Sequence, residues 1–497
     1  MHIFSTLFTA QSVDNELRTE EGLQYAIDWC KASGLRKVYV ESFRSNVFVD
    51  QAHLEKVRDR FIEEGFDVQG CVTTTDMLKS SNGWRNIVCF THKPNYDLME
   101  SIFRRTAAVF DVIMIDDFLF TDCTCEDCDK ARGERSFSEY HCDVMSELSR
   151  DRILRPAKEV NPGCKIIIKY PLWYEDFQLK GYDVIRQTRD FDLTWIGTET
   201  RDPDNERWGR YPQTQAFYVM LWAVKLDPAK MGGGWYDPYG TSPPTYLEQA
   251  RQTIMGGVKE SMMFCYGSLY KGDEGVNNTA AAREEMTGLH KLAYLVSGKE
   301  ARGVSVPKMP TYDPLTEKYL SSFYGMLGIP VVPDICLDPC AKSVILGTQA
   351  AGFPDALAYM RDALRGGKAL CFSKGFLDHY NMDAPKGAPV VDPGDDNWNI
   401  VDMPAAKLKA LRGALLKPLG ISFKAPSRVA LNLYDDDMEI INNFNDFEVE
   451  VTIDLKGRHP KTRRIELVLS EGNAVSMKRD GSKYTLKIAP RTLVALA

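Results

Sequence analysis

A run of three cysteines is the sharpest chemical signal in the sequence. Cys123, Cys125 and Cys128 form a C-x-C-x-x-C motif in a polar segment. Three thiolates this close suit a tetrahedral zinc ion, which needs one more ligand, and a four-sulfur site is closed and structural. The alternative is a chance cluster of buried thiols. The candidates for the fourth ligand are other cysteines of the same region, Cys89 and Cys142, with Cys71 behind them.

Carboxylates at the ends of apolar runs form the second chemical group. Asp116 and Asp117 follow Ile115, and Glu199 follows Gly197-Thr198. Glycoside cleavage typically uses two carboxyl groups, of which one protonates the leaving oxygen and the other is the nucleophile or activates water. Asp116, Asp117 and Glu199 can supply this pair. Neighbouring strand residues point to opposite faces, so Asp116 and Asp117 share one face only if the chain turns between them. One is therefore expected to be the catalyst and the other a support.

Two of these carboxylates have competing interpretations. Glu199 precedes Arg201 and Asp202, so a structural ion pair at the base of a loop is the alternative to catalysis. Asp237 is a candidate second carboxylate or a ligand of sugar hydroxyls, but it also suits the cap of a turn before Pro238.

Aromatic residues near the same run ends are candidates for sugar binding, because the C–H faces of sugar rings stack on aromatic side chains. Trp235 and Tyr236 follow three glycines and are the strongest candidates. Trp195 lies inside an apolar run and is expected in the core. Glu41 and Arg44 are expected to contact the substrate or each other. The predicted substrate-binding residues are Glu41, Arg44, Tyr170, Trp235, Tyr236 and Tyr266.

The elements that must position these residues alternate between strands and helices. The predicted strands are His2–Phe8, Lys37–Phe43, Asp67–Thr73, Asp111–Phe118, Cys164–Tyr170, Asp192–Glu199, Met231–Asp237 and Ser261–Gly267. The predicted helices are Thr19–Ser33, Gln51–Glu64, Tyr96–Val109, Ser138–Val160, Pro212–Leu226, Pro244–Met255 and Ala280–Val296. Eight successive strands and a closing helix favour a closed (β/α)8 TIM barrel over an open doubly wound sheet. Active sites of such barrels lie at the carboxyl ends of the strands.

A chain of 497 residues is too long to fold around a single hydrophobic core, so further domains are expected. We predict a catalytic barrel at 1–300, a flavodoxin-like α/β domain at 301–425 and a small C-terminal β-sandwich at 426–497. The predicted elements of the middle domain are the helices Tyr312–Leu327 and Pro354–Leu364, the strands Val344–Gly347 and Lys368–Phe372, and a final helix Pro404–Leu416. The tail alternates as strands do, for example at Glu448–Leu455 and Arg464–Leu469, with turns at Gly472-Asn473 and Asp480-Gly481.

Composition narrows the class of partner. A net charge of -8 and a pI of about 5.6 disfavour nucleic acid as the partner and suit a neutral one. No segment approaches the ~20 apolar residues of a membrane helix, and Met1-His2-Ile3-Phe4 lacks the basic start of a signal peptide. We therefore expect a cytoplasmic protein, unless a secretion signal was trimmed from its N-terminus.

The domain order and the cysteine motif resemble the family forty-two β-galactosidases. In that family one zinc ligand follows the third strand and three follow the fourth, which makes Cys89 the preferred fourth ligand and Cys142 the reserve. The resemblance also implies a homo-oligomer, commonly a trimer. The catalytic pattern departs from it, since the family has Asn-Glu where this chain has Asp116-Asp117. The Ile115-Asp116-Asp117-Phe118 segment is instead similar to the fourth-strand nucleophile of α-galactosidase and family thirty-one enzymes, whose acid/base follows the sixth strand. That match favours Asp116 as nucleophile or base and Glu199 as general acid.

The sequence thus predicts a glycosidase that removes a terminal sugar. One alternative is a non-catalytic carbohydrate-binding barrel, which would bind sugar without turnover. The other is a zinc-dependent carbohydrate deacetylase, which needs an open metal position. The tight thiolate cluster and the lack of an H-E-x-x-H motif disfavour the deacetylase.

Overall fold

The protein is described by a computed structural model that covers residues 2–455, 465–467 and 475–496. It contains two compact units. The barrel unit comprises Met1–Arg201, Leu226–Ala250 and Val258–Arg283, and the second unit comprises Asp202–Lys225, Arg251–Gly257 and Glu284–Ala497. The predicted turn at Gly472-Asn473 lies outside the described residues, as do Arg464, Val468 and Leu469 of the predicted strand Arg464–Leu469.

Eight parallel strands form a closed barrel, as predicted. β1 pairs with both β2 and β9, and each intervening strand pairs in parallel with its two neighbours. The barrel strands are β1 (Ile3–Phe8), β2 (Lys37–Arg44), β4 (Asp67–Thr73), β5 (Val112–Ile115), β6 (Lys165–Tyr170), β7 (Leu193–Gly197), β8 (Met231–Tyr236) and β9 (Glu260–Met263). A two-residue strand, β3 (Val47–Phe48), turns back on the end of β2. β5 and β9 end earlier than predicted, which frees the residues after them to turn.

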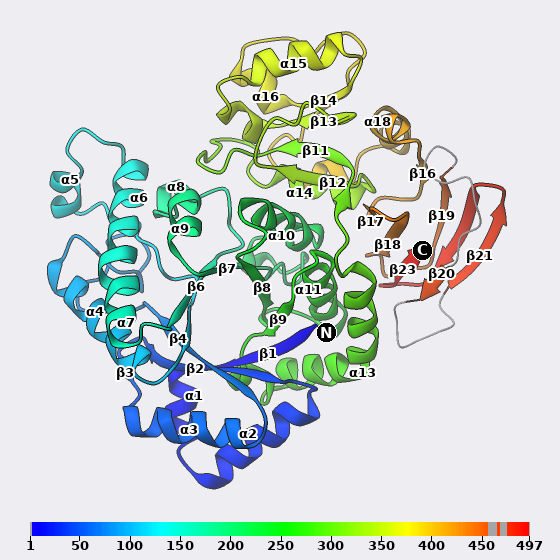
Figure 1. The fold of residues 1–497 in the computed structure, drawn as a ribbon. Coiled ribbons are helices and arrows are strands. Elements are labelled where there is room, and N and C mark those ends of the chain that lie inside the picture. Colours follow the sequence, from blue (N-terminus) through cyan, green and yellow to red (C-terminus); the bar gives the residue numbers. More distant parts are fainter. Residues whose placement is uncertain (1, 456–464, 468–474, 497) are drawn as a thin grey trace. The chain divides into compact units, whose positions relative to one another are not determined.

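Helices alternate with these strands along the chain, and Figure 1 shows α2, α3, α4 and α7 outside the barrel sheet. They are α1 (Ala10–Asn15), α2 (Glu20–Ala32), α3 (Gln51–Glu63), α4 (Lys93–Ala107), α5 (Glu126–Arg132), α6 (Phe137–Leu148), α7 (Arg155–Val160), α8 (Phe177–Lys180), α9 (Val184–Asp190), α10 (Thr214–Leu226), α11 (Pro243–Met255), α12 (Tyr266–Leu269) and α13 (Asp273–Val296). The helix predicted at Ser138–Val160 is split by a π-helical turn, Ser149–Leu154. Capping residues fix where several helices begin. Asp50 accepts a hydrogen bond from the His53 N–H at the start of α3, and Ser136 and Glu139 form a capping box at the start of α6.

The barrel interior is a packed core. It takes one inward side chain from each strand, namely Leu7, Tyr39, Cys71, Met114, Ile167, Trp195, Trp235 and Met262. Trp195 is buried there, as predicted, because two glycines of β8 leave space for its ring. A Cβ on Gly232 or Gly233 would lie 2.6 or 2.8 Å from the Trp195 ring. Side chains fill the centre, so a ligand must bind at the strand ends.

The described residues of the second unit form three further sheets. A parallel sheet has the order β12 (Val331–Asp334), β11 (Val304–Pro307), β13 (Ser343–Leu346), β14 (Ala369–Ser373), β15 (Val390–Val391). One antiparallel sheet has the order β10 (Ala301–Arg302), β17 (Val429–Tyr434), β18 (Met438–Asn443), β23 (Leu493–Leu496), β20 (Ile465–Leu467). The other has the order β16 (Ser422–Lys424), β19 (Val449–Asp454), β22 (Lys483–Ile488), β21 (Val475–Asp480).

The helices of this unit that follow α13 are α14 (Leu320–Phe323), α15 (Ala356–Arg365), α16 (Lys374–His379), α17 (Trp398–Val401) and α18 (Ala405–Leu416). The sequence predicted α15 and α18, but it did not predict the short helices α16 and α17. The predicted helix Tyr312–Leu327 is reduced to α14 and a 3₁₀ turn, Tyr324–Leu327. Glu317 and Tyr319 have φ values of 52° and 65°, which a right-handed helix excludes.

Within the described part of the chain, none of the helices combines the length and the apolar character that a membrane-spanning segment needs.

Candidate active site

Asp116 and Asp117 diverge at the mouth of the barrel. β5 ends at Ile115, so the chain turns and the two carboxyl groups reach different partners. Asp116 Oδ2 accepts a hydrogen bond from the Arg44 guanidinium at 2.6 Å, and its Oδ1 accepts from the Asp117 N–H at 2.6 Å. Asp117 Oδ2 instead accepts from Lys169 Nζ at 2.7 Å. The side chain of Asp117 is 19% exposed and that of Asp116 only 1%, so Asp117 is the more accessible of the two.

Lys169 joins Asp117 to Glu199. Its buried ammonium group donates to Asp117 Oδ2 at 2.7 Å and to Glu199 Oε1 at 2.6 Å, and it lies 3.5 Å from the ring centre of Trp235. The two carboxyl oxygens are therefore no further apart than the sum of those distances. This upper limit on the separation of the two oxygens lies below the ~6.5–9.5 Å separation in inverting glycosidases, so the arrangement is closer to that of retaining enzymes.

Glu199 folds back against its own strand. A Cβ on Gly197 would lie 2.3 Å from Glu199 Oε2, so the carboxyl group occupies space that only glycine leaves open. A substitution at Gly197 would displace Glu199 from Lys169.

Glu41, Arg44 and Thr73 fix Asp116 from the other side. Arg44 Nε donates to Glu41 Oε2 at 2.7 Å, so the expected contact between Glu41 and Arg44 is present. Thr73 Oγ1 lies 3.0 Å from Asp116 Oδ2 and also contacts Glu41 Oε1. Both oxygens of Asp116 are thus satisfied by protein groups, which is typical of a buried structural anion.

The two aspartates have opposite electrostatic settings. Burial opposes ionisation of Asp116, but the charges of Arg44 and Lys169 outweigh it and hold its pKa below the usual range. Burial, assisted by the charges of Asp116 and Glu199, raises the pKa of Asp117 well above the usual range, although Lys169 opposes this. Asp117 therefore holds a proton at pH values at which a lone aspartate would be ionised.

Asp237 is bound to Arg201 rather than free at the mouth. Arg201 Nε and Nη2 donate to the two carboxylate oxygens at 2.8 and 2.6 Å, a bidentate pair. The ion pair that the sequence suggested between Arg201 and Glu199 is thus made with Asp237 instead. Arg201 has a φ of 55°, and its N–H donates to Gln249 Oε1 at 3.1 Å, so the pair is held in place from both sides.

The predicted aromatic contacts divide into two groups. Trp235 faces the barrel interior beneath the carboxyl pair and stacks on Phe264 at 4.7 Å. Tyr170, Tyr236 and Tyr266 do not reach the carboxylates; all three are buried outside the barrel sheet. Tyr170 and Tyr236 each follow an inward residue, Lys169 and Trp235, and successive strand residues point to opposite faces. Tyr266 lies in α12 and stacks on Tyr270 at 4.4 Å.

Four cysteines form a compact group after β4 and β5. The sulfurs of Cys89, Cys123, Cys125 and Cys128 all lie within 4.8 Å of one another. The Cys89–Cys128 and Cys125–Cys128 separations are 3.7 Å, and the Cys89–Cys125 separation is 3.9 Å. Four sulfurs at 2.3 Å from a tetrahedral metal lie about 3.8 Å apart, so this mostly buried group could hold a metal ion.

The two alternative ligands lie elsewhere. Cys142 Sγ contacts the carbonyl oxygen of Gln178 at 3.5 Å, and Cys71 belongs to the barrel core. Cys89 therefore completes the group, as the resemblance implied.

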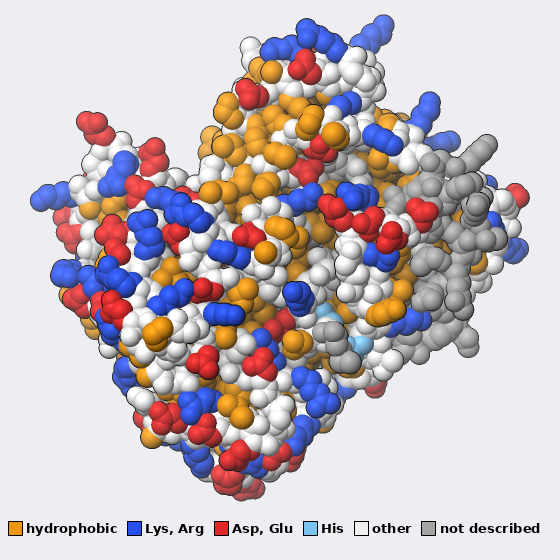
Figure 2. Space-filling model, in the orientation of Figure 1, with side chains coloured by type: hydrophobic (Ala, Val, Ile, Leu, Met, Phe, Trp, Pro, Cys, Tyr) orange, Lys and Arg blue, Asp and Glu red, His pale blue; other side chains and the backbone are white. Residues whose placement is uncertain are grey.

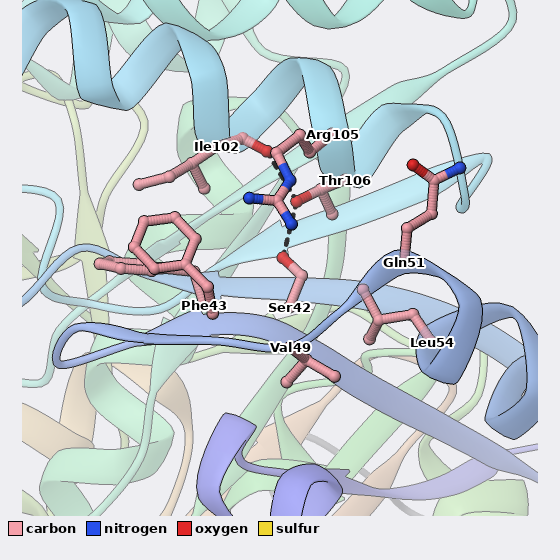
Figure 3. Close-up of a pocket in the computed structure, with 9 residues that line it drawn as sticks. Ser42, Phe43, Val49, Gln51, Leu54, Ile102, Arg105 and Thr106 are labelled. Atoms are coloured by element: carbon pink, nitrogen blue, oxygen red, sulfur yellow. Dashed lines mark hydrogen bonds between the residues drawn. The ribbon is translucent and has the colours of Figure 1, made fainter.

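A small pocket in the wall of the barrel unit is not a rival site. Figure 3 shows it between β2, α3 and α4, lined by Phe43, Val49, Leu54 and Ile102, with Ser42 Oγ 2.6 Å from Thr106 Oγ1. Its volume of about 10 Å³ is at the lower limit for a single water molecule. It lies away from the carboxylates and is a packing defect.

Comparisons with known proteins agree with this geometry. An uncharacterized protein of Saccharolobus solfataricus is 25% identical over an alignment of 368 residues that covers 67% of this chain. The chain spans 60% of the length of that relative. Among solved structures, α-L-fucosidase isoenzyme 2 from Paenibacillus thiaminolyticus is similar with a TM-score of 0.67 at 10% identity, over 100% of this chain and 99% of that one. At that identity the likeness shows a shared fold.

The family is shown by sequence. The model of the catalytic domain of probable glycosyl hydrolases matches residues 1–308, which include the whole barrel and every carboxylate described above. The chain therefore belongs to the family of probable glycosyl hydrolases.

Proposed function

We propose that this glycosidase cleaves a terminal sugar from a neutral glycoside, with Asp117 and Glu199 as the catalytic pair. The observation that carries the proposal is the Lys169 ammonium group, which holds one oxygen of each carboxyl group at 2.7 and 2.6 Å. The sequence favoured Asp116 as the nucleophile. We assign this role to Asp117 instead, because Asp116 is buried and both its oxygens are bound by protein groups.

In the proposed reaction Asp117 is the nucleophile and Glu199 the acid/base. The proton that Asp117 holds first moves to Glu199. Glu199 gives it to the leaving oxygen, while the ionised Asp117 attacks the anomeric carbon and forms a glycosyl ester. Glu199 then takes a proton from water, which hydrolyses the ester and restores the pair. Asp116, fixed by Arg44, keeps the Asp117 backbone in place through the Asp117 N–H. The Arg201–Asp237 pair borders Glu199 and is proposed to bind sugar hydroxyls.

The charge balance of the mouth favours an uncharged sugar. Carboxyl groups outnumber basic side chains there. The acids are Glu41, Asp116, Asp117, Glu199 and Asp237, and the bases are Arg44, Lys169 and Arg201. A uronide or sulfated sugar would add a negative charge to this buried excess. On the face shown in Figure 2, acidic and basic side chains are also interspersed, without a broad region of one sign.

The carboxyl separation predicts net retention of the anomeric configuration. A panel of α- and β-linked nitrophenyl glycosides of neutral sugars identifies the substrate. It includes an α-L-fucoside, because the protein named as an α-L-fucosidase shares this fold. Proton NMR of the first product should show the substrate's anomer before mutarotation. Appearance of the opposite anomer would exclude Asp117 as a nucleophile at this distance from Glu199.

Lys169→Met is expected to move the acid limb of the kcat/KM profile to higher pH. Lys169 opposes the raised pKa of Asp117, so removing its charge raises that pKa further. The ionised nucleophile is then lost at higher pH as acid is added. Lys165→Met is the matched control at the exposed start of the same strand. An unchanged limb in Lys169→Met, with the fold intact, would mean that the pair does not control activity.

We propose zinc as the metal of the four-cysteine group. The donors are all sulfur, and tetrahedral sulfur sites select zinc or iron–sulfur clusters. With four protein ligands the metal keeps no open position, so its proposed role is to join the loops after β4 and β5.

We also propose the three-domain division at 1–300, 301–425 and 426–497. The parallel sheet of the second unit has the strand order 2-1-3-4-5 of flavodoxin-like folds. The antiparallel sheets share one core, with Leu431 and Ile441 from one sheet packed with Val451 and Leu486 from the other, as in a sandwich.

A homo-oligomer, with the trimer as first candidate, is proposed from the family forty-two resemblance. Beside the edge strand β15 lies a groove of about 640 Å³ whose lining mixes apolar side chains, such as Val390 and Met403, with charged ones, such as Asp402 and Lys407. Mixed surfaces of this kind are common at subunit interfaces.

A further inference from the structure

A cluster of aromatic rings lies beside the proposed catalytic pair. Trp84, on the loop between β4 and α4, is 50% exposed although it is large and apolar. Its ring centre lies 5.6 Å from that of Phe120 and 6.1 Å from that of Trp173. Phe120 follows β5 and Trp173 follows β6, the strands that lead to Asp117 and Lys169. The cluster is therefore at the carboxyl ends of the barrel strands, on the same side as the carboxylates.

The cluster is continuous with Asp117. Phe118, the next residue, is half-buried and stacks on Phe120, with ring centres 6.5 Å apart and an interplanar angle of 22°. Tyr182 donates its hydroxyl hydrogen to the Asp117 carbonyl oxygen at 2.6 Å, and its ring contacts Trp173 at 5.7 Å. Two ring contacts thus lead from the neighbour of Asp117 to Trp84.

The loop that carries Trp84 is held in place by polar contacts. The Trp84 N–H donates to Asp122 Oδ2 at 2.9 Å, and Lys180 Nζ lies 3.2 Å from the same oxygen and 4.9 Å from the centre of the Trp84 ring. Asn82 Oδ1 accepts from the Thr124 N–H at 2.8 Å. Cys89, at the other end of the loop, belongs to the four-cysteine group.

This fixation points to binding rather than to folding. An exposed indole contributes little to the core, whereas an aromatic side chain that is already ordered binds a ligand without a further entropic cost. Indole and phenyl faces suit the C–H faces of sugar rings.

We propose that Trp84 and Trp173 form a stacking platform for a second sugar unit, on the leaving-group side of the bond cleaved beside Asp117. This inference rests on the proposed function and names its substrate class as oligosaccharides rather than simple glycosides. The four-cysteine group then acts on substrate binding indirectly, by holding the loop that presents Trp84.

The test compares a substrate that reaches the platform with one that does not. For the sugar identified on the panel, the trisaccharide extends beyond the cleaved bond, while the glycosyl fluoride ends at it. In Trp84→Ala the ratio of kcat/KM for the trisaccharide to that for the fluoride should fall about tenfold, and Trp84→Phe should retain most of it. The control Tyr25→Ala removes an equally exposed aromatic of the same unit, 55% exposed on α2, and should leave the ratio unchanged.

An unchanged ratio in Trp84→Ala would overturn the platform. Failure of the proposed function is a different result: the wild type would then cleave neither substrate. In that event, titration calorimetry with neutral tri- and tetrasaccharides of glucose, mannose, galactose and xylose still tests whether Trp84 binds sugar. Binding by the wild type that is about tenfold weaker in Trp84→Ala supports the platform, and no binding, or equal binding by both, refutes it.

Discussion

Asp117→Asn is expected to lower kcat/KM on the order of 10⁴-fold while the free energy of unfolding changes by no more than about 1 kcal/mol. The variant keeps the shape of the side chain but removes the nucleophile. Stability should persist because burial and two neighbouring carboxylates already raise the pKa of Asp117, so its charge does not stabilise the fold. Lys169 also keeps Glu199 as a partner. Steady-state kinetics and urea unfolding measure the two effects.

Asp116→Asn is the matched variant. It is expected to lower stability more than Asp117→Asn does and to lower kcat/KM less. Asp116 is a buried partner of Arg44 with a lowered pKa, so its removal should cost about 3 kcal/mol of stability. Its effect on kcat/KM should be smaller than that of Asp117→Asn, since it acts by positioning the Asp117 backbone. A larger kinetic loss in Asp116→Asn, with Asp117→Asn still active, would restore Asp116 as the nucleophile.

Cys123→Ser is expected to abolish metal binding and to destabilise the barrel unit on the order of several kcal/mol. The wild type should contain one zinc ion per chain, because the four sulfurs form a single tetrahedral group. Elemental analysis of the purified protein gives the zinc content, and thermal unfolding with and without a chelator gives the stability.

Cys142→Ser provides the control for the metal site. Cys142 is buried like Cys89, Cys123 and Cys128, but it contacts Gln178 rather than the four-cysteine group. It should therefore keep a full complement of zinc and most of the stability. Zinc lost equally from both variants, or absent from the wild type, would contradict a structural zinc held by Cys89, Cys123, Cys125 and Cys128.

The barrel was predictable because its signals are local. Apolar runs and amphipathic segments alternate with the periods of strands and helices, and the eight predicted strands appear in order, Asp67–Thr73 with unchanged bounds. The helix predicted at Tyr312–Leu327 fails because apolar spacing does not report φ, and the positive φ values at Glu317 and Tyr319 depend on tertiary contacts. β11 and β12 were missed because each contains a proline, Pro307 or Pro333, a residue that is typical of loops rather than of strands.

The site was predictable in its residue types but not in its pairing. The predicted ends of the strands identified Asp116, Asp117 and Glu199 as site residues, and the spacing of the cysteines identified the metal group. Which aspartate meets Glu199 depends on β5 ending at Ile115, one residue before a turn that no local pattern marks. Lys169 was visible at a strand end, yet its role arises from a contact with Glu199 across 30 residues of sequence. Trp84 gave no signal, since its place beside Trp173 is set by the loops that the cysteines join.

The central claim, that Asp117 and Glu199 act as nucleophile and acid/base, is tested most directly by trapping the glycosyl ester. Glu199→Gln, given the glycosyl fluoride of the preferred sugar, should form the ester quickly and hydrolyse it slowly, because the variant lacks the base that activates water. Mass spectrometry of its peptides should then find the mass of one sugar on Asp117. A sugar on Asp116, Asp237 or another side chain would contradict the account, as would a wild type that turns over with no ester formed in the variant.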